Sequence, residues 1–207
     1  MFNIHLMGDF KDLNQLTKDR PVPENAVQFE EGNSFQDIFI TGLKIAVPIG
    51  LVMILCAIIR IKNLDYDVHF SILTVELIIL AAASTYLLAY VHEFIHALFY
   101  PIDAEKQVWK MLDQGAFFVY CERETSKIRF IVMCLAPAVI LGIIPYIFWL
   151  AFPLALTFTG GIMVLVISFL MTFMALGDYV NVYNAIKQVP KDAKIFNFGI
   201  HSYWIDK

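Results

Sequence analysis

Long apolar stretches dominate the pattern of hydrophobic and polar positions along this chain. A transmembrane helix needs about 20 mostly apolar residues, and four segments meet that length: Ile38–Ile59, Phe70–Tyr100, Phe130–Phe152 and Leu154–Tyr183. The last two form one run, Phe130–Gly177, without a charged residue or a histidine. That run is too long for one span and fits two, with a turn near Thr157–Gly161. The pattern therefore predicts four transmembrane helices, at about residues 38–60, 70–100, 130–152 and 154–186.

Composition agrees with this pattern, since 59% of the 207 residues are hydrophobic and only 16% are charged. Such a chain belongs to the membrane class rather than to ordinary soluble domains. The predicted fold is an all-α membrane protein, a bundle of four transmembrane helices with a small cytoplasmic β-hairpin between the second and third helices. The expected domains are a cytoplasmic N-terminal segment (1–37), the transmembrane domain (38–187, whose loop 101–129 holds the hairpin) and a cytoplasmic tail (188–207).

Lysine and arginine set the expected orientation in the membrane. Twelve of them fall in the N-terminal segment, in the loop between the second and third helices and in the tail, which a four-helix topology places on one side. The other side has Arg60 and Lys62. A multi-pass plasma-membrane protein with both termini in the cytoplasm is therefore expected. The net charge of −4 gives no indication of a nucleic-acid partner.

The stretch Val91–Pro101 places three polar groups in an apolar segment, VHEFIHALFYP. His92 and His96 are four residues apart and share one helix face, so both imidazoles can bind one Zn²⁺. Glu93 then faces the attacking water as general base, which is the HExxH pattern of zinc peptidases. Ionisable groups inside a membrane helix cost on the order of 2.5 kcal/mol each and usually mark function. The alternatives are coincidence, or a segment that lies beyond the lipid headgroups.

Asp178 is the candidate third ligand, because catalytic zinc sites have three protein ligands and one open position. It is the only acidic residue of the fourth predicted helix. His92 and Asp178 each lie roughly 12–14 Å from the cytoplasmic end of their helix. The alternative is a carboxylate exposed to headgroups. Rival acidic ligands in the loop read as solvated charges: Asp103, Glu105, Asp113, Glu122 and Glu124.

Asn181 shares a helix face with Asp178, since it follows by three residues. It is expected to orient Asp178 or to donate to a substrate carbonyl; bridging two helices is the alternative. Gly177 and Ala97 are small, so they are expected to let the second and fourth helices approach closely.

The loop before the third helix has the composition of strands. Ala116–Cys121 (AFFVYC) is rich in aromatic residues and Val, Glu122–Ser126 (ERETS) fits a turn, and Lys127–Val132 (KIRFIV) fits a second strand. An edge of such a hairpin can pair with an unwound substrate, with Phe118 and Tyr120 as candidate contacts. A hairpin that merely caps the bundle is the alternative.

Several motifs together resemble a known family. These are HEFIHA at His92–Ala97, LAP at Leu135–Pro137, GDYVN at Gly177–Asn181, PENAVQFEEG before the first helix, and FFVYCERETSKIRFIVMCLAP leading into the third. The chain resembles the small bacterial zincin peptidases, membrane proteins related to the site-2 protease superfamily, over most of its length. The resemblance implies a zinc endopeptidase of a bacterial plasma membrane. Site-2 proteases carry their third ligand in an Asn-Pro-Asp-Gly-like motif, whereas Asp178 has neither Pro before it nor Gly after it.

The predicted function is a membrane-embedded zinc metalloprotease with one Zn²⁺ held by His92, His96 and Asp178. It is expected to hydrolyse peptide bonds of membrane or juxtamembrane polypeptides near the cytoplasmic face, with zinc-activated water and Glu93 as general base. Its expected partners are a membrane-anchored polypeptide substrate and the lipid bilayer. The alternative is a metal-binding membrane protein without catalysis, such as a zinc carrier, sensor or scaffold.

Overall fold

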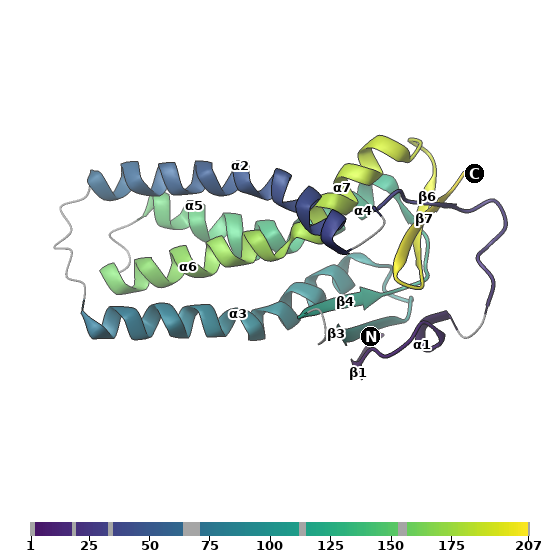
Figure 1. Ribbon diagram of the computed structural model, residues 1–207, viewed down its shortest axis with the longest axis horizontal. Helices are drawn as coiled ribbons and strands as arrows, with labels where there is room; N and C mark the ends of the chain where they lie inside the picture. Colours follow the sequence, from purple (N-terminus) through teal and green to yellow (C-terminus); the bar gives the residue numbers. More distant parts are fainter. Residues whose placement is uncertain are drawn as a thin grey trace.

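A computed structural model describes residues 3–17, 20–32, 35–63, 71–111, 115–152 and 157–206 (Figure 1). Long helices run side by side over most of the length of the molecule, and two small sheets lie together at one end. Both ends of the described chain lie at this sheet-bearing end (Figure 1). The arrangement is mixed rather than all-α, because the described residues include seven strands in two sheets.

Three helical segments are long and apolar enough to cross a membrane: Gln36–Lys62, Ile72–Phe99 and Lys127–Ala151. They correspond to α2 (Phe35–Lys62), α3 (Ile72–Phe99) and the continuous run of α4 (Lys127–Pro137), the π-helical segment η2 (Ala138–Ile143) and α5 (Ile144–Ala151). A fourth span exists if the bent pair α6 (Phe158–Met174) and α7 (Leu176–Gln188) is counted as one crossing. A short helix, α1 (Asn14–Thr17), precedes them.

The boundaries of α3 follow from its sequence. Ser71 caps the first turn in a reciprocal capping box with Thr74, which satisfies backbone N–H groups that have no partner inside the helix. Tyr100 leaves the helix with φ −70° and ψ 158°, because Pro101 disfavours a helical conformation in the residue before it. The helix thus ends just after the HExxH segment.

The sequence predicts one continuous helix over 154–186, but in the structure this apolar segment is divided into two helices. It bends by 46° between α6 and α7, where Ala175 has φ −81° and ψ 22°. A break leaves helix carbonyls without their usual amide partners. The phenol of Tyr179 donates to one of them, the carbonyl of Thr172, at 2.9 Å. As a result Asp178 lies in the first turn of α7 rather than in mid-helix.

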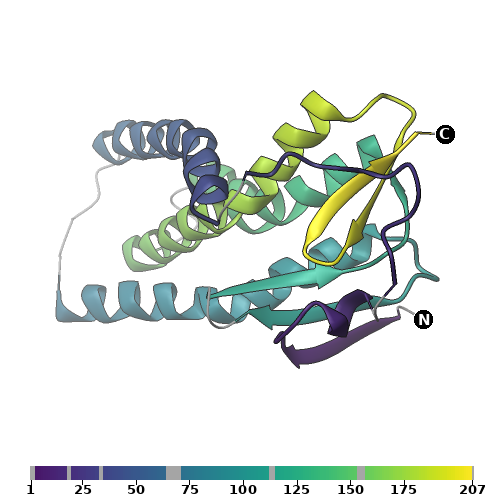
Figure 2. The same cartoon turned by 45° about the vertical axis from the view of Figure 1, so that its right-hand side comes forward.

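Each sheet joins segments from distant parts of the sequence. The first has the order β1–β3–β4, with β1 (Ile4–Asp9) parallel to β3 (Lys106–Met111) and β4 (Ala116–Tyr120) antiparallel to it. The second has the order β2–β7–β6–β5 and is antiparallel, built from Val27–Gln28, His201–Ile205, Lys194–Phe198 and Thr125–Ser126. In Figure 2 the β6–β7 hairpin lies between β4 and α7. The flanking segments 1–37 and 188–207 therefore contribute strands to the sheets.

The predicted hairpin lies between α3 and α4, but it uses a different partner strand. β4 pairs with β3, which precedes it, and Lys127–Val132 is helical instead of extended. Ser126 caps this helix by accepting the backbone N–H of Arg129. Its buried residues are Phe130, Met133, Cys134, Ala136 and Pro137, and all but Ala136 follow the spacing of three and four that marks one helix face. Helical periodicity therefore overrode the β-branched composition.

Gly42, rather than Gly177, lies at a close approach of two helices. A Cβ on Gly42 in α2 would lie 2.8 Å from both the Cβ and the backbone oxygen of Leu176 in α7. A Cβ on Gly177 would meet no atom within 4 Å. The expected close approach of Gly177 to the second helix is thus not present, and Gly177 borders a cavity instead.

These two glycines give a matched pair of stability tests. We expect Gly42→Ala to lower the unfolding free energy by about 1–3 kcal/mol, because the added methyl overpacks the α2–α7 contact. Gly177→Ala adds a methyl in open space and is expected to leave stability equal or slightly higher. Thermal unfolding in detergent measures both. Equal melting temperatures for the two variants would contradict this account of the contact.

Candidate metal centre

The two histidines of α3 lie on one face, one turn apart. Both are buried, with 5% of His92 and 7% of His96 exposed. Their ring centroids are 4.8 Å apart and the Nε2 atoms are separated by 3.1 Å. The two Nε2 nitrogens are therefore close enough for one metal ion to contact both.

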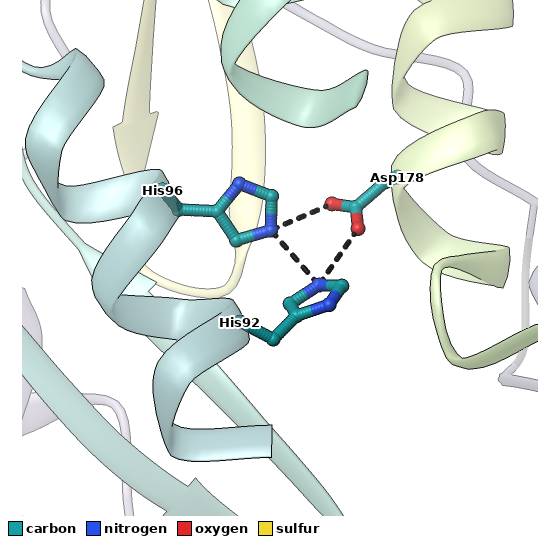
Figure 3. A group of neighbouring side chains, drawn as sticks. All are labelled: His92, His96 and Asp178. Carbon is teal, nitrogen blue, oxygen red and sulfur yellow. Dashed lines mark hydrogen bonds and ion pairs between the residues drawn. The ribbon is translucent and has the colours of Figure 1, made fainter. Parts of the chain in front are cut away.

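Asp178 reaches these two nitrogens from α7 (Figure 3). Its Oδ2 lies 3.1 Å from Nε2 of His92, and its Oδ1 lies 3.2 Å from Nε2 of His96. Its side chain is 15% exposed. Placement in the first turn of α7 also favours a negative charge, since the unpaired N–H groups and the helix dipole are positive there.

The donor set fits zinc. Two ligands at 2.0–2.1 Å from a tetrahedral Zn²⁺ are about 3.3 Å apart. The two Nε2 atoms are 3.1 Å apart, and each lies 3.1–3.2 Å from a different oxygen of Asp178; with one oxygen taken as the ligand, all three ligand atoms lie within 4.8 Å of one another. Two imidazoles and one carboxylate also form the known ligand set of catalytic zinc, which leaves a fourth position for substrate or water. Among the described residues, this trio is the group of His, Cys, Asp and Glu side chains placed to hold a metal ion.

His96 is held by a second hydrogen bond on its far nitrogen. Nδ1 lies 2.9 Å from the backbone oxygen of Met133 in α4. A carbonyl only accepts, so Nδ1 carries the proton and Nε2 presents its lone pair toward His92 and Asp178. His92 has no such support, because its buried Nδ1 has no hydrogen-bond partner among the described residues.

Pro137 explains why the Met133 carbonyl is free inside a helix. That carbonyl would normally accept the backbone N–H four residues later, at position 137, and proline has none. Pro137 lies within α4, and the π-helical segment η2 follows directly. The proline of the LAP motif therefore frees the Met133 carbonyl to accept the hydrogen bond that orients His96. No local pattern in the sequence connects this motif to His96, because the two bonded residues are 37 positions apart.

Glu93 lies beside the trio, 8% exposed, and borders a cavity of about 510 Å³. The cavity is bounded by α3, β4, α7, the turn between β6 and β7, and the first turns of α2. The backbone of Val119 in β4 faces the Glu93 carboxylate. A carboxylate thus lies next to His92, His96 and Asp178, at the wall of a cavity large enough for a peptide segment.

The other predicted site residues have different places. Asn181 borders the cavity, as its spacing from Asp178 predicts. The side chains of Phe118 and Tyr120 pack with Leu16 and Trp109 in a cluster beneath the N-terminal segment. Both residues also border the cavity.

The rival acidic ligands lie outside the trio. Asp103 pairs with Arg123, and Glu122 with Arg20. Glu105 accepts a hydrogen bond from Gln107, and Glu124 is exposed. Asp113 lies outside the described residues. Asp178 is therefore the carboxylate that the fold brings to both histidines, although its role as a ligand stays a prediction.

The HExxH segment and the grouping of His92, His96 and Asp178 fit a zinc site, and comparison with known families gives the class of the protein. Residues 85–194, which are 110 of the 207, match the model of the family described as "Putative zincin peptidase". The chain belongs to this family, whose class implies zinc as cofactor and a metallopeptidase activity. The matched residues include all three of the trio and Glu93. The comparisons found no match among curated proteins or solved structures.

Metal content tests the trio directly. We expect about one zinc per chain in detergent-purified protein, and loss of most of it in His96→Ala and Asp178→Ala, because each removes one of three ligands. Asp103→Ala is the control, since this exposed carboxylate pairs with Arg123 at the surface. Elemental mass spectrometry gives the ratio. Zinc retained in Asp178→Ala would show that another group supplies the third ligand.

Pro137→Ala tests the orientation of His96. The new backbone N–H can bond to the Met133 carbonyl and compete with Nδ1 of His96. We expect zinc affinity to fall roughly tenfold, the lower end of the range for such supporting groups. Pro48→Ala, an exposed proline inside α2, is the matched control. Competition with a chelator of known zinc affinity measures both, and an unchanged affinity in Pro137→Ala would contradict the assignment.

Proposed function

We propose that the protein is a membrane-embedded zinc peptidase that cleaves membrane or juxtamembrane polypeptides near the cytoplasmic face. One observation carries the proposal. The His92–His96 pair meets Asp178 at 3.1–3.2 Å, with Glu93 beside them at the wall of a cavity. A metal-storage or structural site has no need of the glutamate, whereas hydrolysis needs a base.

His92, His96 and Asp178 would hold the zinc. A bound zinc supplies Lewis-acid polarisation of the scissile carbonyl and a water activated for attack. Glu93 accepts the proton of the attacking water and then delivers it to the leaving amine. Asn181 is placed at the cavity wall to donate a hydrogen bond to a substrate carbonyl.

The edge of β4 that pairs with no other described strand is the proposed binding site for the substrate backbone. β4 stands at the edge of its sheet and pairs with β3 on its other side. Helical carbonyls are shielded from attack, so a membrane-anchored substrate has to unwind, and pairing with an edge strand satisfies its backbone. Because Phe118 and Tyr120 pack in the cluster with Leu16 and Trp109, we assign the contact to the β4 backbone rather than to these side chains.

Depth and charge support the proposed location. His92 precedes the end of α3 at Phe99 by seven residues, which is about 10 Å along the helix. The predicted basic side lies at the same end as both sheets and both termini, so the positive-inside rule places this end in the cytoplasm. HExxH on an apolar helix, with an Asp on a later one, is also our ground for a relation to site-2 proteases.

Glu93→Gln separates catalysis from metal binding. The variant keeps all three ligands and loses the base, so we expect unchanged zinc content and cleavage reduced about 10²–10⁴-fold. New N-termini among membrane proteins of a bacterial host expressing each variant report cleavage. Glu76→Gln is the control, since Glu76 is exposed near the far end of the same helix. Equal new termini for wild type and Glu93→Gln would rule out Glu93 as the base.

A further inference from the structure

A tyrosine continues the face of the two histidines. Tyr100 follows His96 by four residues, as His96 follows His92, and it forms the C-terminal cap of α3. It is 3% exposed and borders the same cavity as the trio. The HExxH helix therefore directs a fourth polar side chain to this space, one turn nearer the sheet-bearing end.

The C-terminal hairpin fixes the orientation of this phenol. Nδ2 of Asn197 in β6 donates to the phenol oxygen of Tyr100 at 3.0 Å. The amide oxygen of Asn197 accepts the hydroxyl of Ser202 in β7 at 3.3 Å. Asn197 thus presents its N–H to Tyr100, and the phenol oxygen acts as an acceptor.

The hydroxyl proton of Tyr100 makes no hydrogen bond within the described part of the chain. No group among the described residues accepts it, and Tyr100 packs in an apolar cluster with Cys121, Phe130 and Cys134. A buried donor without an acceptor is unfavourable, and such groups call for a partner. The cavity that Tyr100 borders is the space from which an acceptor can come.

We propose that Tyr100 donates a hydrogen bond to a backbone carbonyl of the polypeptide substrate, and that Asn197 is the positioning residue for it. One helical turn, about 5.4 Å, separates Tyr100 from His96. Two residues of extended chain span about 6.6 Å. The carbonyl therefore belongs to a residue one or two positions from the scissile bond, on the side toward the sheets. This inference rests on the proposed peptidase function.

Hydroxamates separate binding to the metal from binding by Tyr100. Acetohydroxamate has only the zinc-binding group. A Leu-Leu hydroxamate and a succinyl hydroxamate extended by Leu-Leu add backbone carbonyls in opposite directions. We expect Tyr100→Phe to weaken one of the two extended compounds roughly fivefold to tenfold, the usual effect of one lost hydrogen bond. Acetohydroxamate affinity and zinc content stay unchanged. Calorimetric titration of the zinc-loaded protein measures all three.

Asn197→Asp distinguishes this role from a structural one. A carboxylate in place of the amide accepts the phenol proton, so the side chains stay bonded while the donor is lost to the substrate. We expect Asn197→Asp to weaken the same extended hydroxamate as Tyr100→Phe does. A purely structural bond would be kept and leave binding unchanged. Tyr146→Phe is the control for loss of a buried phenol, since Tyr146 donates to the carbonyl of Met53 in α2.

The outcomes separate the two proposals. If the wild type holds zinc but binds the extended compounds no more tightly than acetohydroxamate, or if Tyr100→Phe binds them as the wild type does, the role of Tyr100 is wrong and the metal site stands. If the wild type holds no zinc after zinc loading, the peptidase proposal itself fails.

Discussion

The hydrogen bond from His96 to the Met133 carbonyl connects the metal-type cluster to the packing of the bundle. α3 and α7 carry the three candidate ligands, and each of them packs against α4. The carbonyl that receives Nδ1 of His96 belongs to this shared helix. The missing N–H of Pro137 makes the acceptor available without an added polar side chain in the core. α4 thus sets both the separation of the two ligand-bearing helices and the direction of one ligand.

Bringing two imidazoles and a carboxylate together among apolar helices is costly without a cation, because buried charges need partners. The bend at Ala175 reduces this cost at Asp178, since a new helix begins there and its first-turn N–H groups favour a negative charge. The same bend leaves a carbonyl on Thr172 that the Tyr179 phenol satisfies. Metal binding would contribute the remaining stabilisation, so the native state and the loaded state are expected to be closely coupled.

Hydropathy and spacing predicted the apolar helices and the polar residues that meet between them, because both signals are local. The number of residues between each side chain and the end of its helix predicted that Asp178 and His92 lie at the same depth in the membrane. The strands were harder to predict. β3 was missed because its residues Lys106 and Lys110 are charged, as is usual in a loop. In the structure Lys106 is fully buried and donates to the carbonyl of Ile102. The pairing of β1 with β3 joins residues about a hundred positions apart, and no local pattern specifies such a partner. The bend at Ala175 was also hard to predict, because no proline lies near it in the sequence.

A zinc carrier is the main rival to a peptidase, and the distribution of polar groups argues against it. Transport needs polar or ionisable groups along a path through the membrane. Apart from His92, His96 and Glu93, the buried polar side chains of α3 and α6 among the described residues are Thr74, Ser168 and Thr172, and none of these three is ionisable. The hydroxyl of Thr172 is already bonded to the Ser168 carbonyl. The cavity instead borders β4 and the β6–β7 turn at the sheet-bearing end. One end thus brings together an edge strand, the Glu93 carboxylate and the three candidate ligands, an arrangement that peptide hydrolysis would use and that ion passage does not need.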